Sequence, residues 1–328
     1  MTHTTGADVT FPAGPVLVTG GTGFVGSHLV HALVGLGAEV HVLHRPSSAR
    51  GRLAGVAERV TTWVGDLTDA QVMQEICAEI EPRTVYHLAA DTGVRIADPE
   101  LEAVRASLAQ NVLGSIHLVL ALRRTGSVRV LVRLGGVEEY GRGPAPCRET
   151  QREAPVSPYS ASQVAVTHYL QMLQPSLGFD ALTLRPTLVY GPGQSEGFFV
   201  PSLIRACLAG RAFAMTTGTQ VRDLVFVDDL VAALLSAARV TGLGGQVLNV
   251  GSNRFHRIVD VARTIVRLSA SSSALEIGAV ARRTNEVEQL HADSTLAAER
   301  LGWRAETELE TGLVATIAWY RAHPEGQP

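Results

Sequence analysis

The chain has 328 residues, 46% hydrophobic and 18% charged, with a formal net charge of -3 at pH 7. This balance is typical of a globular protein and gives no basic field that would attract nucleic acid or an anionic membrane. No apolar run reaches the roughly 18–20 residues that span a bilayer, and the N-terminal stretch lacks the positive and apolar regions of a signal peptide, so we expect a cytoplasmic protein.

A strand, a glycine-rich turn and a helix open the chain in PVLVTGGTGFVGSHLVHAL, residues 15–33. Glycines in such a turn let the backbone approach a pyrophosphate, which then sits at the N-terminus of the helix. A second strand, AEVHVLHR, follows, and this context predicts dinucleotide binding rather than a structural turn. The residues expected to hold this part of the cofactor are Gly20, Gly23, Phe24, Val25 and Gly26.

The end of the second strand indicates which cofactor is bound. An Asp or Glu there would bind the ribose 2′-hydroxyl of NAD. The chain instead has His44 and Arg45, with Arg50 and Arg52 close behind. A guanidinium suits a 2′-phosphate, so we predict NADPH/NADP+. The alternative is that these arginines only solvate a loop.

The next two strands end in GDL and YHLAA, residues 65–67 and 86–90. Asp66 is placed to accept a hydrogen bond from the adenine amine, and the small residues after the fourth strand let the backbone pass close to the cofactor. Strands and helices alternate here, which predicts a doubly wound parallel sheet. The further cofactor contacts predicted are Asp66, Leu67, Leu88, Ala89 and Ala90.

Together with QNVLGS and YSAS, these motifs resemble the extended short-chain dehydrogenase/reductases, in the branch of nucleotide-sugar epimerases and dehydratases. The likeness runs from about residue 15 to 321 and includes LRPTLVYGPGQ, QVRDLVFVDDLVAAL and GQVLNVGS. It implies an α/β Rossmann fold, a doubly wound parallel sheet with a smaller, interleaved C-terminal substrate-binding lobe. The expected organisation is a flexible tail over 1–14, an NADP-binding Rossmann domain over 15–187 to which 222–250 return, and a substrate-binding lobe made of 188–221 and 251–328.

The family's catalytic set is Asn, Ser or Thr, Tyr and Lys, and only half of it is present. Asn111 and Tyr159 match, whereas Gly136 stands in the Ser/Thr position and Gln163 in the Lys position. All 28 basic residues of the chain are arginine, so no lysine exists to activate Tyr159. A tyrosine without a neighbouring cation should keep its ordinary pKa of about 10. Such a group can donate a proton but is a poor base, which favours ketone reduction over alcohol oxidation.

These losses lead to one main interpretation and two alternatives. The main one is an NADPH-dependent ketoreductase of a natural product, an aromatic polyketide of the angucyclinone type, with the proton supplied by the substrate's own phenol, by Tyr159 or by water. The first alternative is a nucleotide-sugar 4-ketoreductase or epimerase of deoxysugar biosynthesis. The second is a non-catalytic NADP(H)-binding sensor.

The segments expected to bind substrate contain residues that support a nucleotide-sugar enzyme and residues that do not. Dehydratases of this family carry an acidic pair after the Ser/Thr, and here only Glu138 remains, because Val137 fills the other position; Glu138 and Glu139 alternatively face water or a helix. Arg222 is either a diphosphate clamp or the partner of an Asp in the VDD segment or of Asp223. The predicted substrate contacts are Thr92, Val137, Glu138, Thr187 and Arg222, and Gln163 and Pro186 are further cofactor contacts. Phe198 and Phe199 of the GFFVPSLI segment would line an apolar cleft for a polyketide, or are instead core residues.

The remaining features predict few other ligands. The three cysteines and eleven histidines show no metal-ligand spacing, so we expect no metal site. The expected partner is a small-molecule substrate, with no nucleic acid or membrane. The resemblance suggests a homodimer through the helices that hold residues 107–122 and 159–174.

Overall fold

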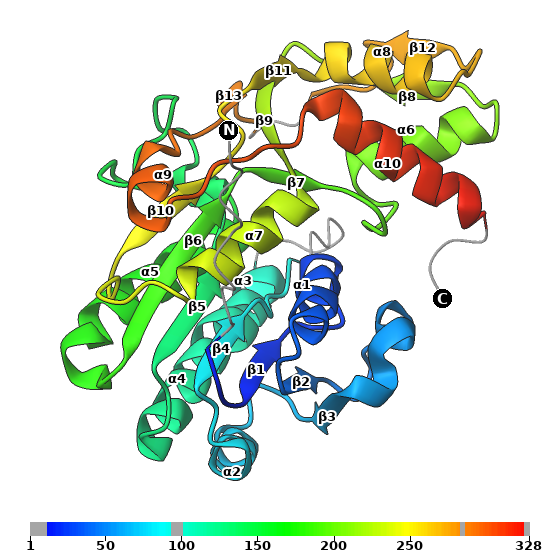
Figure 1. The fold of residues 1–328 in the computed structure, drawn as a ribbon. Helices are drawn as coiled ribbons and strands as arrows, with labels where there is room; N and C mark the ends of the chain where they lie inside the picture. Colours follow the sequence, from blue (N-terminus) through cyan, green and yellow to red (C-terminus); the bar gives the residue numbers. More distant parts are fainter. Residues whose placement is uncertain (1–11, 93–100, 283–285, 325–328) are drawn as a thin grey trace, which may run out of the picture.

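A parallel sheet of seven strands forms the larger lobe of the computed structural model, which describes residues 12–92, 101–282 and 286–324 (Figure 1). The order is β10-β6-β5-β4-β1-β2-β3, so the direction of strand addition reverses between β1 and β4. A crevice at the carboxyl ends of these strands is the usual place for a dinucleotide. The strands are β1 (Val16–Thr19), β2 (Val40–His44), β3 (Val60–Val64), β4 (Thr84–His87), β5 (Val130–Leu134), β6 (Asp180–Pro186) and β10 (Val247–Val250).

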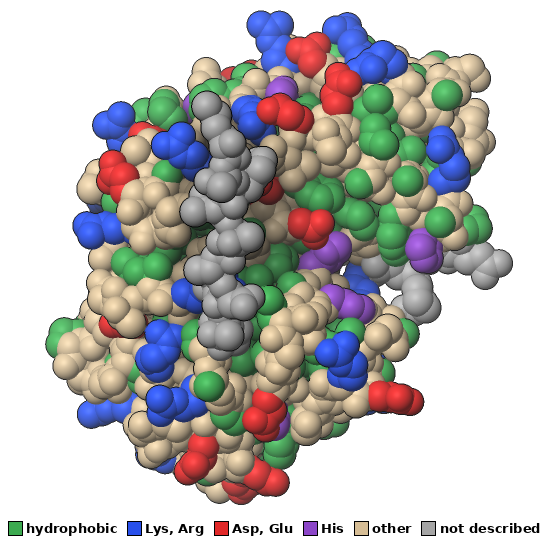
Figure 2. All heavy atoms as spheres, in the orientation of Figure 1, with side chains coloured by type: hydrophobic (Ala, Val, Ile, Leu, Met, Phe, Trp, Pro, Cys, Tyr) green, Lys and Arg blue, Asp and Glu red, His purple; other side chains and the backbone are tan. Residues whose placement is uncertain are grey.

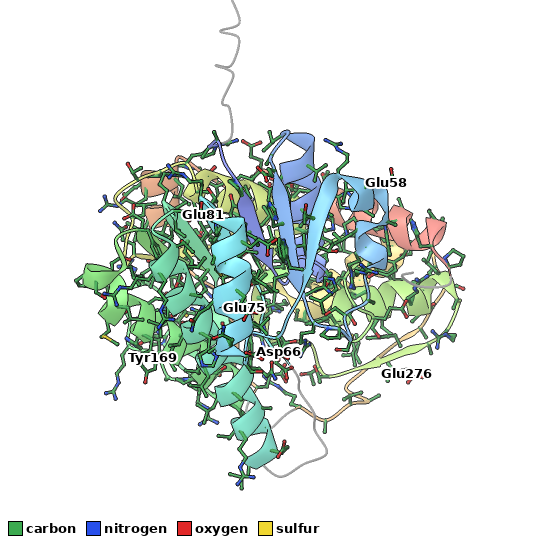
Figure 3. All side chains as sticks on the ribbon, turned by 90° about the horizontal axis from the view of Figure 1, so that it is seen from below. Glu58, Asp66, Glu75, Glu81, Tyr169 and Glu276 are labelled. Carbon is green, nitrogen blue, oxygen red and sulfur yellow. The ribbon has the colours of Figure 1, made fainter. Side chains whose placement is uncertain are left out.

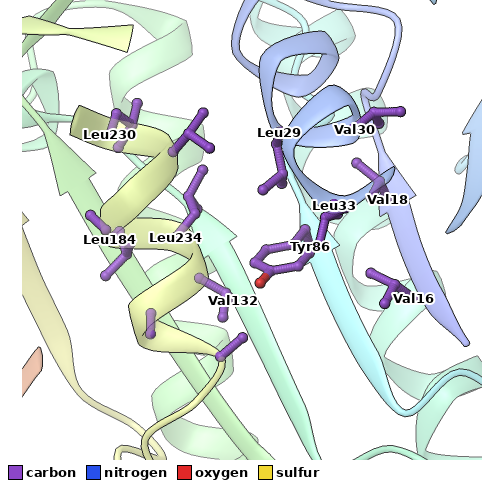
Figure 4. Packing of buried hydrophobic residues seen from close by; sticks show 14 of the residues in the cluster. Val16, Val18, Leu29, Val30, Leu33, Tyr86, Val132, Leu184, Leu230 and Leu234 are labelled. Atoms are coloured by element: carbon purple, nitrogen blue, oxygen red, sulfur yellow. The ribbon is translucent and has the colours of Figure 1, made fainter. Parts of the chain in front are cut away.

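Helices cover both faces of this sheet, which explains why nearly every side chain of the central strands β1, β4 and β5 is buried, whichever face it points to. One face carries α1 (Phe24–Gly35), η1 (Gly51–Arg59), α7 (Val227–Ala237) and α9 (Thr295–Leu301). The other carries α2 (Ala70–Ile80), α4 (Gly114–Thr125) and α5 (Pro158–Leu177), and α3 (Leu101–Ser107) leads through the π-helical turn η2 (Leu108–Leu113) into α4. Figure 4 shows α1 and α7 side by side, with Leu33 and Leu234 packed on the sheet around the fully buried Tyr86.

The smaller lobe is built around β9, the middle strand of a second sheet that runs β11-β9-β13, with β7 also paired to β9. Its strands are β7 (Leu188–Tyr190), β9 (Val221–Phe226), β11 (Phe255–Arg257) and β13 (Gln289–Leu290), and β8 (Phe213–Met215) pairs with β12 (Leu275–Ile277). The helices α6 (Phe199–Leu208), α8 (Ile258–Leu268) and α10 (Leu309–Ala322) pack together on it (Figure 1). The short helix η3 (Val137–Tyr140) follows β5.

The predicted lobe boundaries need two corrections. Residues 222–226 do not return to the Rossmann sheet, because β6 is already paired with β5 and β10 and leaves no edge there for β9. The chain returns only with α7 and β10. Conversely, the residues of α9 are predicted to belong to the substrate-binding lobe, yet Ala297 and Leu301 are buried in the core of the larger lobe.

Three further expectations concern surfaces and termini. Residues 1–11 of the predicted tail lie outside the described residues. No helix in the described part of the chain combines the length and apolar character that a membrane span needs. Arginines and acidic residues are interspersed on the face drawn in Figure 2, so this face carries no single basic patch.

Candidate active site

A cleft of about 210 Å³ lies at the carboxyl ends of β1 to β4. Among the residues predicted to contact the cofactor, those that line it are Gly20, Gly23, His44, Arg45, Asp66, Leu67, Leu88, Ala89 and Ala90. The lining also contains residues that the sequence interpretation missed, namely Thr19, Thr22, Leu43, Ser48, Gly65, Asp91 and Gln110. Phe24, Val25, Gly26, Gln163 and Pro186 lie outside this lining.

The glycine turn under the cleft is too tight for side chains. Gly20 has a φ of +71°, and a Cβ on it would lie 2.7 Å from the Ala89 amide nitrogen. A side chain on Gly26 would collide with the Gly20 carbonyl. The turn therefore keeps the cradle that a pyrophosphate needs, directly before the first free N–H groups of α1.

The ribose end of the cleft contains an uncommitted arginine. Arg45 is exposed and lines the cleft beside the half-buried Ser48. His44 Nδ1 donates a hydrogen bond to the Arg45 carbonyl at 2.9 Å, and its buried Nε2 has no partner within the described residues. Arg52 is not available in the same way, because it donates to the carbonyls of Gly193 and Thr22.

Asp66 lies at the opposite wall, near the end of β3 (Figure 3). Its Oδ1 accepts hydrogen bonds from the backbone N–H and the hydroxyl of Thr68, at 2.9 and 2.8 Å. These two bonds fix the carboxylate against the cleft, as a contact to an adenine amine would require.

Tyr159 lies in the first turn of α5, which Ser157 caps and Pro158 starts. The prediction that this tyrosine keeps its ordinary pKa is wrong. Burial raises the pKa of the phenol, and the Glu138 carboxyl raises it further, whereas the Arg133 guanidinium opposes both. A phenol with a raised pKa is an even weaker base at neutral pH than the sequence suggested.

A buried cation, Arg133, lies next to Gln163, although the sequence predicted no cation near this position. Arg133 projects from β5 and is 2% exposed. Its Nη2 donates to the side-chain Oε1 and, at 3.0 Å, to the backbone carbonyl of Gln163. Its Nη1 donates to the Thr167 hydroxyl at 2.7 Å. The charge that α5 lacks at position 163 is thus supplied from the neighbouring strand.

Glu139 is the centre of a buried ion network rather than a solvent-facing charge. Its side chain is fully buried, and Oε2 accepts from Arg185 Nε and Nη2 at 3.0 and 2.7 Å and from the Thr167 hydroxyl at 2.8 Å. Its Oε1 lies 3.7 Å from Arg133 Nη1. Arg185 in turn binds Glu153 at 2.8 Å. Of the two predicted environments, water is wrong because Glu139 is fully buried, whereas Glu139 does face helix α5 through Thr167; its two arginine partners come from strands β5 and β6.

Position 136 lacks the hydroxyl of the family, but it is not an empty space. A Cβ built on Gly136 would overlap Glu138 Oε2, and one on Gly135 would overlap Glu139 Oε1. The two glycines of the GGVEEYG segment thus make room for its two glutamates. Val137 between them is fully buried with Tyr140 and Cys147, so its predicted contact with substrate is wrong.

Asn111 is 2% exposed in the π-helical turn, a type of helix distortion that is frequent at functional sites. Its Nδ2 donates to the Asp91 carbonyl at 3.1 Å and to the Ser162 hydroxyl at 2.9 Å, and its Oδ1 accepts from the Asp91 N–H at 2.7 Å. The side chain therefore joins the loop after β4 to α5 and positions the helix that carries Tyr159.

Arg222 is committed to its own lobe. Its Nη1 donates to the carbonyls of Val221 and Glu288 at 2.8 and 3.2 Å, and its Nη2 lies 3.8 Å from Glu286. The predicted aspartate partners are wrong, because Asp223 accepts from Ser252 and Asn253, Asp228 faces His28, and Asp229 accepts from the backbone at 306 and 307.

The other residues predicted to contact substrate differ in their exposure to solvent. Phe198 is 54% exposed, whereas Phe199 packs edge-on against Phe213 in the core of the smaller lobe. Thr187 is buried, and its hydroxyl has no hydrogen-bond partner among the described residues. Thr92 is exposed at the end of a described segment. Within the described residues, no group of three or more His, Cys, Asp or Glu side chains could hold a metal ion.

Comparison with known proteins identifies similar chains over most of the length. The profile of the NAD dependent epimerase/dehydratase family matches residues 16–251. A UDP-glucose 4-epimerase of Mycolicibacterium smegmatis is 33% identical over 321 residues, which cover 93% of this chain and 98% of the relative. A dTDP-glucose 4,6-dehydratase of the same species is 32% identical, with 94% and 93% covered.

Solved structures agree with the fold. The UDP-glucose 4-epimerase of Thermotoga maritima with UDP-glucose gives a TM-score of 0.86 at 28% identity, over 95% of this chain and 100% of that one. The UDP-glucose 4-epimerase of Thermus thermophilus with NAD gives 0.83 at 28%, over 94% and 99%. These similarities confirm the predicted α/β fold with its parallel sheet and smaller C-terminal lobe.

Proposed function

The chain belongs to the NAD-dependent epimerase/dehydratase family, and we propose that within this family it is an NADPH-dependent reductase of a ketone on a nucleotide-linked sugar. The observation that carries this proposal is the environment of Tyr159. Oxidation of a hydroxyl needs a base, and burial and Glu138 both raise the pKa of this phenol. Reduction of a ketone needs an acid, which a protonated phenol or carboxyl supplies. Reduction therefore suits the site better than epimerisation or dehydration.

The described residues fit a nicotinamide dinucleotide. The tight turn at Gly20 and Gly26 is a cradle that a Cβ would fill, and Asp66 lies at the opposite wall. When bound, the cofactor would supply the hydride. The choice of NADPH rests on Arg45 and Ser48, which line the ribose end, since the T. thermophilus relative was solved with NAD.

The relatives favour a nucleotide sugar as substrate. The similar proteins reported above are named for UDP-glucose or dTDP-glucose, and they match nearly their whole length. They reverse the order of the two interpretations that the sequence suggested, and an angucyclinone ketoreductase in particular has no support from them.

An aromatic polyketide ketone is the second candidate, because Arg222 is not free. Two backbone carbonyls and Glu286 occupy its guanidinium, so a diphosphate would have to displace a carboxylate. The exposed Phe198 offers an apolar contact that a ring system could use.

The test is NADPH oxidation, followed by absorbance, with a nucleotide 4-keto-6-deoxyhexose and with a phenol-flanked polycyclic ketone in parallel. Turnover of the keto sugar supports the main proposal. Turnover of the aromatic ketone alone would transfer support to the second candidate. Tight NADPH binding without oxidation by either ketone class would contradict both and favour the non-catalytic sensor.

We also propose a homodimer through α4 and α5. These helices and the turn before α4 expose large apolar side chains, including Leu113, Leu120, Tyr169 and Met172. Figure 3 shows Tyr169 at the surface of α5. Burying such a patch against a second copy removes apolar surface from water. Light scattering after size exclusion should give twice the chain mass, and Tyr169→Glu should reduce it to a single chain.

A further inference from the structure

Two adjacent glutamates in η3 differ in their burial and in their hydrogen-bond partners. Glu139 is fully buried and binds Arg185 and Thr167. Glu138 is half-buried, and its carboxyl accepts a hydrogen bond from its own backbone N–H but from no other described side chain. The side chain folds back so that Oε2 lies 2.4 Å from the point that a Cβ on Gly136 would occupy. A carboxyl group bound to no other side chain of the described residues thus lies beside the position where the family's Ser/Thr is missing.

We infer that the Glu138 carboxyl replaces the missing hydroxyl and is the acid that protonates the substrate's carbonyl oxygen. This inference rests on the proposed ketone reduction and names its proton donor. Tyr159, on the first turn of α5, is close enough to the same carboxyl for Glu138 to raise the pKa of the phenol, so the two proton-bearing groups are neighbours. The catalytic pair is then a carboxyl and a phenol rather than a hydroxyl and a phenol.

The surroundings of Glu138 favour the protonated form of its carboxyl. Burial raises the pKa of the carboxyl, and the neighbouring Glu139 raises it further, whereas Arg222 on β9 lowers it. Arg133 on β5 is the other cation near this space, but it is bound to Thr167 and Gln163 and faces Glu139. Tyr159 on α5 is neutral at physiological pH, because its own pKa is raised. A neutral carboxyl can donate, whereas a carboxylate can only accept.

The proton and electron balance of the step is complete. The carbonyl carbon gains hydride, the C=O π bond breaks toward oxygen, and that oxygen takes the proton from Glu138. The products are the alcohol and the Glu138 carboxylate, which regains a proton from water before the next turnover. No further oxidant or reductant is needed beyond the hydride donor of the proposed reaction.

Glu138→Gln is the first test, because glutamine keeps the size of the side chain but has no proton to give. Its kcat for the ketone that the wild type reduces should fall about 10²-fold. The wild-type rate should be constant at low pH and fall as pH rises through the Glu138 pKa, since the acid must be protonated, and the variant should lose this decline. Glu149→Gln is the matched control, because Glu149 is also a half-buried carboxyl with a raised pKa but accepts its hydrogen bond from the Asn249 N–H instead.

A rescue variant separates the acid from a merely structural role. Glu138→Ala removes the carboxyl, and adding Gly136→Ser to it restores a hydroxyl in the space that the carboxyl vacates. We expect this double variant to recover at least about tenfold over Glu138→Ala, a modest share of the usual acid contribution. No recovery, with both variants folded by circular dichroism, would overturn the inference.

A readout that needs neither cofactor nor substrate is the ¹³C NMR titration of glutamate carboxyls in the free protein. The signal that disappears in Glu138→Gln should titrate well above the usual glutamate range of about 4.3. If Glu138→Gln keeps the wild-type rate and its alkaline decline, the inference is wrong and the proposed reduction stands. If the wild type reduces neither ketone, the proposed function fails, and the titration alone then decides whether Glu138 holds its proton.

Discussion

The two ends of the active site differ in how many hydrogen bonds and ion pairs their side chains already make within the protein. At the cofactor end, β1 to β4 present glycines, alanines and the exposed Arg45, which make few bonds within the protein. Between β5, η3 and α5, by contrast, Arg133, Glu139 and Arg185 bind one another or Thr167 and Gln163, although the buried Nη1 of Arg185 has no partner within the described residues. The comparison indicates that the glycine turn keeps its shape without bonds from other side chains. Where catalytic side chains of the family are replaced, by contrast, the remaining buried charges need new partners nearby.

The largest expected effect is a loss of stability, caused by a substitution in the ion network between β5, η3 and α5. Glu139→Gln leaves Arg133 and Arg185 buried, with Glu153 as their one remaining carboxylate partner among the described residues. Removing one member of a buried charge network costs about 3–5 kcal/mol of unfolding free energy, because the remaining charges stay desolvated. Urea unfolding followed by circular dichroism measures this loss. A loss below about 1 kcal/mol would show that the network is not a structural unit.

Glu138→Gln is the control for that variant, because it changes the adjacent carboxyl, which has no ion-pair partner. The pKa of Glu138 is raised in the folded protein, so the stability linked to its protonation is present at low pH and lost as pH rises through the folded pKa. The variant should therefore equal the wild type at pH 4, below the unfolded-state pKa of about 4.3, and be more stable than it at pH 8.

At the cofactor end, the sharpest test is the glycine turn. Gly26→Ala places a methyl group against the Gly20 carbonyl, which is rigid backbone, and should destabilise the protein by about 1–3 kcal/mol and weaken NADPH binding at least tenfold. Gly35→Ala in the same helix meets no atom within 4 Å and should be neutral or stabilising. Calorimetric titration with NADPH distinguishes the two, and equal affinities would contradict a cradle at this turn.

Arg45 tests whether the uncommitted arginine selects the cofactor. Arg45→Ala should lower NADPH affinity by about 1.5–3 kcal/mol, the range for a hydrogen bond to a charged group, while NADH affinity changes little. Arg50→Ala is the comparison, since Arg50 is exposed but does not line the cleft. Fluorescence titration of both variants with both nucleotides gives the four affinities. An equal loss for NADPH and NADH would contradict recognition of a 2′-phosphate.

The smallest effect is expected at Arg222. Its guanidinium is already bound to two carbonyls and lies near Glu286, so Arg222→Ala should reduce UDP or dTDP binding by less than about threefold if those bonds persist. Glu286→Gln should then increase nucleotide binding by freeing the arginine. A loss above tenfold in Arg222→Ala would show that the guanidinium changes partners on binding, and would strengthen the nucleotide-sugar assignment.

Much of this molecule follows from its sequence. The strand, turn and helix at residues 15–33 predict the parallel sheet and the cleft, because backbone geometry depends on glycine positions that a sequence displays. The buried network of Arg133, Glu139 and Arg185 beside α5 cannot be predicted in this way, because it joins residues that are distant in sequence. Arg133 is visible as a charge within the apolar strand LVRLGG, yet its partner Gln163 lies 30 residues away. The sequence places β9 in the wrong sheet because an apolar pattern predicts a strand and not its neighbours.

The pairing of Gly136 with Glu138 also constrains how this site can evolve. Gly136→Ser alone forces a side chain into the space of the Glu138 carboxyl, and loss of Glu138 alone leaves neither carboxyl nor hydroxyl there. Each single change passes through a form with a displaced or missing donor. The two positions are therefore expected to be coupled, because a serine at 136 requires the flexible Glu138 side chain to turn away from it.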